Sequence, residues 1–313
     1  MNAYLPWIMV AFGIVLLAKG ADWLVDGASR IALRLGVSPF VVGLTVVGFG
    51  TSMPEFAVSV VASVKGSGGL SLGNAVGSNI MNLLLVLGVA AVLAPIHVLG
   101  SRRALWRDLL FGIIPAAILI ASAWDGDIER PWALLLLMVF ATFIAVTWIQ
   151  ARREDQSPTV VTGNPIRHVF LTILGIAVLV TGSEMMVSGG VDLARRFGVS
   201  DAIIGLTLVA FGTSLPELAT SVTAALKGQS EISVGNVLGS NVFNLGLIVG
   251  TAFTIRPMTV PNIVIRHDIP FLIAATLVVG IVVLRDRKIS RLEGAGMLIA
   301  VASYLVFVVI RGG

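Results

Sequence analysis

The sequence predicts an all-α integral membrane protein with ten transmembrane helices, arranged as two inverted five-helix repeats. Three observations lead to this prediction: the composition, the number of long apolar segments, and a motif that occurs twice. Of the 313 residues, 57% are hydrophobic and only 12% are charged, and the mean hydropathy is +0.98. Soluble domains carry about 25% charged residues, so the composition excludes an ordinary soluble protein. The chain has no cysteine, which excludes disulfides and thiolate metal sites.

Ten apolar segments are long enough to cross a bilayer, whose hydrocarbon core of about 30 Å requires roughly 20 apolar residues per helix. The N-terminal segment lacks the positively charged start and the small-residue cleavage site of a signal peptide, so we interpret it as the first span. The expected spans are residues 4–34, 38–64, 70–95, 104–124, 131–151, 166–196, 200–226, 232–256, 266–285 and 291–311.

A repeat with an offset of 162 residues relates the two halves of the chain. Gly50–Glu55 (GTSMPE) returns as Gly212–Glu217 (GTSLPE), and 217 − 55 gives 162. Because each half holds five spans, an odd number, the second half must enter the membrane upside down, as in many secondary transporters. The expected parts are transmembrane repeat 1 at 1–151 (motif 43–82), a polar linker at 152–165, and transmembrane repeat 2 at 166–313 (motif 205–244).

The distribution of basic residues predicts the orientation in the membrane. The loops after the odd-numbered spans hold 13 Lys and Arg residues, and the opposite side holds 7. Cytoplasmic loops of membrane proteins are enriched in Lys and Arg, so we expect the linker 152–165 in the cytoplasm and both termini outside. The same enrichment accounts for the net charge of +4 without a nucleic-acid partner.

Each motif places a glutamate inside an apolar run, where a carboxylate is costly unless it has a partner and therefore indicates function. Pro54 lacks an N–H and clashes with the carbonyl of Gly50, so the second span should break there; Pro216 should do the same in the seventh. Freed carbonyls, carboxylates and hydroxyls are the ligands that hard cations prefer. Alternatively, Ser52 and Glu55 form only the capping box of a new helix.

The third span adds a polar stripe on one helix face, because Asn74, Ser78 and Asn82 are spaced i, i+4 and i+8. We expect Ser78 and Asn82 to line a cavity and Asn74 to belong to an outer layer. The alternative is a stripe of interhelical hydrogen bonds beside a GxxxG packing motif. Asn79 and Asn241 lie off the stripe and should bond to backbone or to neighbouring helices. The stripe recurs in the eighth span as Asn236, Ser240 and Asn244.

The paired GTSxPE motifs, each followed by a GN…GSN…N helix, resemble the two α-repeats of the cation/Ca²⁺ exchanger superfamily, in particular the sodium/calcium exchanger group. The resemblance extends over essentially the whole chain. It is greatest to the compact bacterial and archaeal members, since the short linker leaves no room for a soluble regulatory domain. It implies an antiporter that exchanges Ca²⁺ for Na⁺ by alternating access in the inner (cell) membrane of a prokaryote.

The resemblance also implies the ion ligands. Glu55 and Glu217 would bridge a central Ca²⁺, to which Thr51 and Thr213 would add their carbonyls. Four serines would help to form flanking Na⁺ sites, and two asparagines would line the centre. The full expected set is Glu55, Glu217, Thr51, Thr213, Ser52, Ser214, Ser78, Ser240, Asn82 and Asn244, with the carbonyls of Gly48 and Ala210.

One departure from the family pattern concerns charge. Exchangers of this group often have Asp at one third-layer position, whereas this chain has Asn at both Asn82 and Asn244. The two glutamates then give the site a charge of −2, which one Ca²⁺, two Na⁺ or two protons would balance, while three Na⁺ would leave +1. Stoichiometry and the choice between Na⁺ and H⁺ coupling therefore stay open. Two facing carboxylates would also titrate as a coupled pair.

Three other functions are compatible with parts of the pattern. One is H⁺-coupled exchange of Ca²⁺ or of another divalent ion such as Mn²⁺. A cation channel could use the glutamates for selectivity, but inverted repeats with broken helices favour an exchanger. A hydrolase with Ser52 or Ser214 as nucleophile would need a base within reach, and neither motif contains His, so we expect no enzyme.

We expect no cofactor: Ca²⁺ and Na⁺ are substrates, with H⁺ as the alternative coupling ion. The other expected partner is the lipid bilayer, with no nucleic acid and no obligate protein partner. Lys19, in the first span, either pairs near a helix end or neutralises a site carboxylate.

Overall fold

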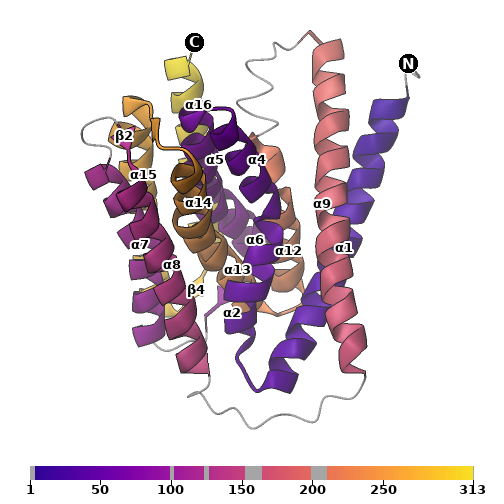
Figure 1. Cartoon of the computed structure of the whole chain (residues 1–313). Coiled ribbons are helices and arrows are strands. Elements are labelled where there is room, and N and C mark those ends of the chain that lie inside the picture. Colours follow the sequence, from indigo (N-terminus) through magenta and orange to yellow (C-terminus); the bar gives the residue numbers. More distant parts are fainter. Residues whose placement is uncertain (1–3, 99–101, 123–126, 152–163, 199–209, 313) are drawn as a thin grey trace.

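In the computed structural model, the described part of the chain is almost entirely helical (Figure 1). The structure describes residues 4–98, 102–122, 127–151, 164–198 and 210–312. Within these ranges, eight helices are long and apolar enough to cross a membrane, and a further span consists of two helices bent by 47°. The unbroken helices are α1 (Leu5–Leu35), α7 (Arg102–Ser122), α8 (Arg130–Ala151), α9 (Pro165–Arg196), α15 (Ile269–Asp286) and α16 (Arg291–Gly312).

The second span is interrupted at Ser52, where the helix stops and a new one starts with Pro54 in its first turn. This position confirms the break predicted from the missing N–H of proline. The seventh span breaks in the same way at Ser214, although its first part, 199–209, lies outside the described residues. The pieces are α2 (Pro39–Val42), η1 (Gly43–Val47), α3 (Gly48–Thr51), α4 (Met53–Val64), α11 (Ala210–Thr213) and α12 (Leu215–Leu226).

The third and eighth spans form the centre of the bundle. In their apolar windows, 72% and 94% of the residues are buried, against 22% in α8 and α16. Each central span contains a π-helical stretch, a form that often occurs at functional sites. The third span consists of α5 (Gly68–Met81), η2 (Asn82–Val86) and α6 (Leu87–Leu93), and the eighth of α13 (Ser230–Val242), η4 (Phe243–Ile248) and α14 (Val249–Ile255). A further π-helical stretch, η5 (Val264–Asp268), precedes α15.

Among the described residues, the predicted GxxxG packing is seen in the eighth span. In α13, a Cβ on Gly239 would lie 2.1 Å from the carbonyl oxygen of Leu44, so η1 lies directly against this helix. Around Gly73 and Gly77 of α5, no atom of the described residues comes within 4 Å of such a Cβ. Glycine at 239 therefore permits backbone contact between the second and eighth spans, across the two halves.

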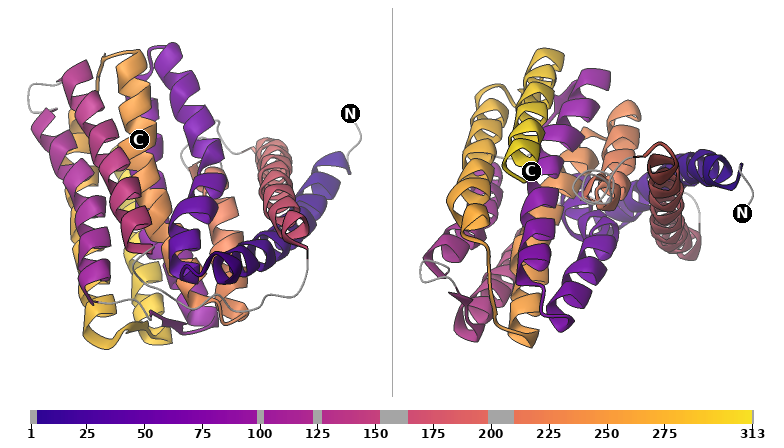
Figure 2. Two further views of the ribbon diagram at one scale, coloured as in Figure 1. Left: turned by 60° about the horizontal axis from the view of Figure 1, so that its bottom comes forward. Right: turned by 90° about the horizontal axis from the view of Figure 1, so that it is seen from above.

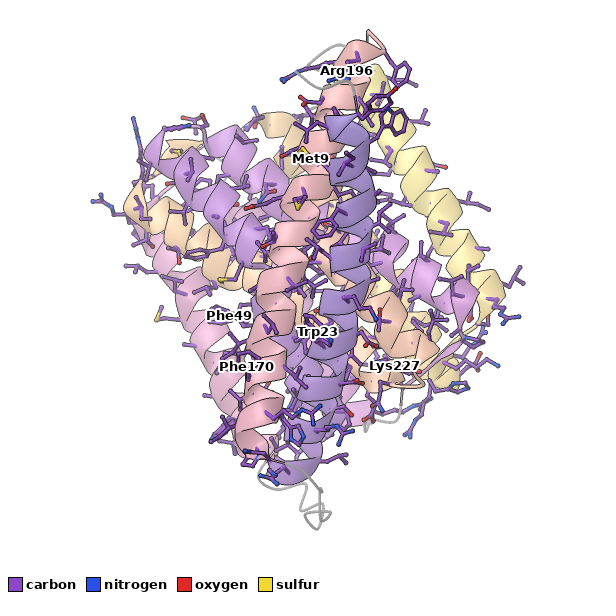
Figure 3. All side chains as sticks on the ribbon, turned by 90° about the vertical axis from the view of Figure 1, so that its right-hand side faces the viewer. Met9, Trp23, Phe49, Phe170, Arg196 and Lys227 are labelled. Carbon is purple, nitrogen blue, oxygen red and sulfur yellow. The ribbon has the colours of Figure 1, made fainter. Side chains whose placement is uncertain are left out.

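The first and sixth spans, α1 and α9, run antiparallel against one another along most of their length (Figure 3). Their contact follows glycines at seven-residue intervals. A Cβ on Gly20 would lie 2.8 Å from the backbone nitrogen of Leu179, and one on Gly175 would lie 2.6 Å from that of Leu24. The antiparallel pairing of two helices in equivalent positions is what inverted repeats require. The six glycines are Gly13, Gly20 and Gly27 of α1 and, at the offset of 162, Gly175, Gly182 and Gly189 of α9.

Seen from above, the pair of α1 and α9 lies to one side of the other helices (Figure 2, right). Of the two, α1 makes the wider contact with the rest, through α12 and α2. The hydrophobic core lies on the other side and is formed by the two central spans with α7, α8, α15 and α16.

Two short antiparallel ladders, which the sequence did not predict, join the loops of opposite halves. Strand β1 (Ile96–His97) pairs with β4 (Lys288–Ile289), and β2 (Asp127–Ile128) pairs with β3 (Met258–Thr259). The first ladder joins the loops after the third and ninth spans, and the second those after the fourth and eighth. Loops that the basic-residue count assigned to one side of the membrane are thus found together.

Candidate cation-binding site

Both motif glutamates sit in the first turn of a helix that follows a break, Glu55 in α4 and Glu217 in α12. Neither residue has any exposed surface, and Ser52, three residues before Glu55, bonds the carboxylate of Glu217. None of the ion pairs among the described residues involves either glutamate. Two carboxylates that the sequence places 162 residues apart therefore share one buried region, as predicted.

Hydroxyl groups of one half reach the glutamate of the other half. The Ser52 hydroxyl donates to Oε1 of Glu217 at 3.3 Å. In the opposite direction, Thr213 interacts with the Glu55 carboxylate, and Ser78, from the same half as Glu55, faces that carboxylate too. Neither carboxylate oxygen of Glu55 forms a hydrogen bond of good geometry with these hydroxyls or with any other group in the described part of the chain.

The capping-box alternative is wrong, because Ser52 makes no side-chain cap at the start of α4. Its hydroxyl crosses to the other half instead. The start of α12 likewise has no side-chain cap from Ser214, whose hydroxyl is 1% exposed and unpartnered among the described residues. Both serines are therefore oriented for something other than helix capping.

The carbonyl of Gly48 lies among hydroxyl groups. The Ser240 hydroxyl is 3.3 Å from this carbonyl and 3.5 Å from Oε1 of Glu217. The Thr51 hydroxyl donates to Oδ1 of Asn236 at 3.0 Å and lies 3.4 Å from the Gly48 carbonyl. One oxygen-lined region therefore spans both halves and includes the Gly48 carbonyl and the Ser240 hydroxyl. The prediction for Thr51 concerned its backbone carbonyl as a ligand and stays a prediction. Ala210 begins α11, and its side chain lies outside the description.

At the centre, Asn82 and Asn244 are completely buried, at the beginning of the two π-helical stretches. Their amide nitrogens are bonded: that of Asn82 donates to Oδ1 of Asn241 at 3.2 Å, and that of Asn244 to Oδ1 of Asn79 at 2.9 Å. The Oδ1 atoms of Asn82 and Asn244 have no partner among the described residues. The ten residues whose side chains are in the expected ligand set are all 9% exposed or less.

An outer layer supports the glutamates from behind. Asn74 donates to the backbone carbonyl of Glu55 at 3.2 Å and to the Ser59 hydroxyl at 3.0 Å. Asn236 repeats this arrangement with the carbonyl of Glu217 and the hydroxyl of Ser221. The sequence analysis placed Asn74 and Asn236 in an outer layer but missed the two serines. The offset of 162, which relates Ser59 to Ser221, is the signal that would have found them.

The sequence analysis also missed a bond from α9 to the broken seventh span. The carbonyl of Gly212 has no helical partner four residues on, because Pro216 has no N–H. The Ser183 hydroxyl donates to this carbonyl at 2.7 Å. The equivalent residue in the first half is Ala21, so this link occurs in one half only.

Charged residues of α1 do not reach the site. Lys19 is exposed, so it does not neutralise the buried glutamates. Asp22 and Asp26 pair instead with Lys227 at the end of α12 (Lys227 is labelled in Figure 3). The Lys227 Nζ lies 2.5 Å and 2.8 Å from their carboxylate oxygens. These pairs tie the middle of α1 to the second half of the chain.

The site is suited to a hard cation that has lost most of its water. It offers carboxylate, hydroxyl and amide oxygens, several of which are buried and unpartnered among the described residues. Hard cations such as Ca²⁺ take six to eight oxygen ligands of these kinds. In the described part of the chain no group of three or more His, Asp or Glu side chains forms an alternative metal site.

Comparison with known proteins identifies the family. The family model described as "Sodium/calcium exchanger protein" matches residues 5–149 and 167–311. The chain belongs to this family. The two matched ranges coincide with the two halves seen in the sequence and leave out the polar linker between them.

Other exchangers match this member of the family over nearly their whole length. The putative antiporter CaxA of Alkalimonas amylolytica is 36% identical, with 95% of this chain and 96% of the relative aligned. The sodium/calcium exchanger MaX1 of Methanosarcina acetivorans is 32% identical, with 96% and 97% aligned. The solved structure of the sodium/calcium exchanger from Methanococcus jannaschii superposes with a TM-score of 0.85 at 32% identity and covers 97% of this chain and 99% of that one.

Proposed function

We propose that this protein is a secondary active antiporter that exchanges Ca²⁺ for Na⁺ across a prokaryotic cell membrane by alternating access. The observation that carries the proposal is the pair of buried glutamates, one from each half, without a cationic partner among the described residues. Burying two carboxylates is very costly unless a positive charge compensates them. A divalent cation supplies that charge, and so do two monovalent ones.

Competition for one set of ligands is sufficient for exchange. Glu55 and Glu217 would hold the Ca²⁺ between them, and the hydroxyls of Ser52 and Ser240 at Glu217, with Ser78 and Thr213 at Glu55, would complete sites for Na⁺. Carbonyl oxygens of Gly48 and Ala210 would add to these sites. No bond is made or broken, so no catalytic residue and no resident cofactor are required.

The relatives' names support the ions of the proposal. MaX1 and the Methanococcus jannaschii protein are named as sodium/calcium exchangers, and each matches this chain over at least 96% of its length. We extend the same ions to this chain because both motif glutamates and the surrounding hydroxyls converge here. The surrounding lipid would be its other partner, and we propose no obligate protein partner.

We further propose that both termini face outward and that the linker 152–165 is cytoplasmic. The excess of Lys and Arg after odd-numbered spans supports this orientation. The ladder between β1 and β4 supports the assignment of two of those loops to the same side. A cysteine placed in the linker of this cysteine-free chain should react with a membrane-impermeant maleimide only after cells are permeabilised, whereas labelling of intact cells would reverse the orientation.

Ca²⁺ uptake into proteoliposomes tests the proposed function. Vesicles containing the purified protein should accumulate Ca²⁺ when an outward Na⁺ gradient is imposed. An outward H⁺ gradient without Na⁺, applied in parallel, should give no uptake above empty vesicles. Uptake with H⁺ alone would make the protein a proton-coupled exchanger at the same site. Ca²⁺ flux without any counter-ion would identify a channel, and no flux under any gradient would overturn Ca²⁺ as the substrate.

A further inference from the structure

Two asparagines that do not belong to the predicted ligand set, Asn79 and Asn241, connect the two central spans reciprocally. The Asn79 side chain donates to the backbone carbonyl of Asn241 at 3.0 Å, and the Asn241 side chain donates to the backbone carbonyl of Asn79 at 3.3 Å. Both residues are 5% exposed or less. The two bonds therefore form a closed, buried link between α5 and α13.

This link determines the orientation of the side-chain amides of Asn79 and Asn241, that is, the directions in which their NH₂ groups and Oδ1 atoms point. A backbone carbonyl can only accept a hydrogen bond, so each of these asparagines must present its NH₂ group to it. The Oδ1 atom of Asn241 then faces Asn82, and the Oδ1 atom of Asn79 faces Asn244. Since an oxygen needs a donor, Asn82 and Asn244 must turn their NH₂ groups toward it, and the distances of 3.2 Å and 2.9 Å agree.

The orientation of the central asparagines follows from planar amide geometry. Once the nitrogen of Asn82 is bound to Asn241, its Oδ1 must point elsewhere, and the same holds for Asn244. Both Oδ1 atoms are buried and unpartnered in the described part of the chain. Asn82 and Asn244 lie one helical turn beyond Ser78 and Ser240, on the face that meets the glutamates.

We propose that Asn79 and Asn241 are positioning residues that hold the amide nitrogens of Asn244 and Asn82 away from the ion, so that only their oxygens face it. The inference rests on the proposed function, because it assigns a role toward the same transported cation. Without the link, either amide could rotate by 180° and place a donor group against a cation. Partners that orient metal ligands in this way commonly contribute 10- to 100-fold to metal affinity.

The same link makes the central positions specific for a neutral amide. An aspartate at 82 or 244 has no N–H to donate, so its carboxylate would meet the Oδ1 atom of Asn241 or Asn79, acceptor against acceptor. The two positioning residues thus match Asn at both central positions and keep the charge of the site at −2.

Double-mutant cycles on Ca²⁺ affinity test the pairing. The single variants are Asn241→Ala, Asn82→Ala and Asn244→Ala. The two double variants combine Asn241→Ala with Asn82→Ala or with Asn244→Ala. Equilibrium Ca²⁺ binding to the purified, detergent-solubilised protein gives the Kd of each variant. Asn241→Ala alone should weaken binding by about 10- to 100-fold. It should cause little further loss in the Asn82→Ala background, because the residue it orients is already absent, but its full loss in the Asn244→Ala background.

A purely structural role for Asn241 would weaken binding equally in both backgrounds, and that result would overturn the inference. So would a Kd unchanged by Asn241→Ala. The melting temperature without Ca²⁺ shows whether each variant is folded. If Asn241→Ala does not fold, the mirrored cycle with Asn79→Ala provides the test, with Asn244 as the coupled residue and Asn82 as the additive one. If the wild-type protein neither transports nor binds Ca²⁺, the proposed function itself is overturned. If the wild-type protein binds Ca²⁺ normally but the double-mutant cycle shows no coupling between Asn241 and Asn82, only the positioning role is overturned.

Discussion

Replacing either site glutamate by glutamine should abolish Ca²⁺ binding while leaving the fold intact. Glutamine has almost the same shape as glutamate, so Glu55→Gln and Glu217→Gln remove a charge without making a cavity. Each variant would leave a site charge of −1 for an ion of +2. Neither glutamate has an ion-pair partner among the described residues, so no salt bridge of the fold is broken.

The size of the effect follows from the burial of both groups. Two unit charges about 4 Å apart interact by about 4 kcal/mol at an effective dielectric constant of about 20. The removal of one carboxylate from a divalent ion should therefore cost at least about 4 kcal/mol, or roughly a thousandfold in Kd. The two variants should behave alike in Ca²⁺ binding, even though Oε1 of Glu217 accepts from Ser52 and both oxygens of Glu55 are unpartnered in the described chain.

Calcium-dependent stabilisation provides the assay. Wild-type protein should show a higher melting temperature in Ca²⁺ than in a chelator, and both glutamine variants should lose this difference at the same concentration. Glu184→Gln, the same chemical change at an exposed position of α9, is the matched control and should keep it. Retained Ca²⁺ transport in proteoliposomes by either Glu55→Gln or Glu217→Gln would refute the shared central site.

Three further predictions concern charge balance, the attachment of α1 and the glycine contact. With a site charge of −2, two Na⁺ should exchange for one Ca²⁺, so the exchange moves no net charge. A clamped membrane potential of 100 mV should therefore leave the steady-state Ca²⁺ gradient unchanged. Exchange with a third Na⁺ would shift that gradient about 50-fold, because moving one charge through 100 mV corresponds to about 2.3 kcal/mol. Lys227→Met removes the ion pairs with Asp22 and Asp26. It should alter the initial rate of Ca²⁺ uptake by up to about fivefold, because partly exposed ion pairs contribute at most about 1 kcal/mol. The Kd for Ca²⁺ should stay unchanged in the binding assay, and loss of Ca²⁺ binding would contradict the prediction. Gly20→Ala places a methyl group 2.8 Å from the backbone of α9 and should destabilise the protein by about 1–3 kcal/mol in thermal unfolding. The control Gly296→Ala should not destabilise it, because Gly296 is exposed on α16 and no described atom lies within 4 Å of the added methyl group.

The features predicted from the sequence are those that depend on local spacing or on the repeat. Pro54 specifies a break by its missing N–H, and the structure has the break at the preceding turn. The i, i+4, i+8 spacing of Asn74, Ser78 and Asn82 places them on one face, which the structure turns toward the glutamate. The offset of 162 then assigns the same roles in the second half.

Contacts between the halves could not be predicted in the same way. Helical spacing states which residues share a face, but not which residue of another helix that face meets. Thr51 meets Asn236 and Ser52 meets Glu217 because η1 lies against the glycines of α13, a fact of packing. The π-helical stretches shift the register locally without a sequence signature, and two-residue strands are too short to leave a pattern.

The two β ladders bear on how such a chain is assembled. Each ladder takes one strand from each half, so neither half can complete a ladder by itself. At the offset of 162, β1 occupies the position of β3, and β2 occupies that of β4 to within a residue. Two copies of the first half, inserted in opposite orientations, could therefore pair β1 with β2 at both membrane faces. The linked chain has the strand pairing of an antiparallel homodimer, and the covalent link ensures that the two orientations are always present in equal number.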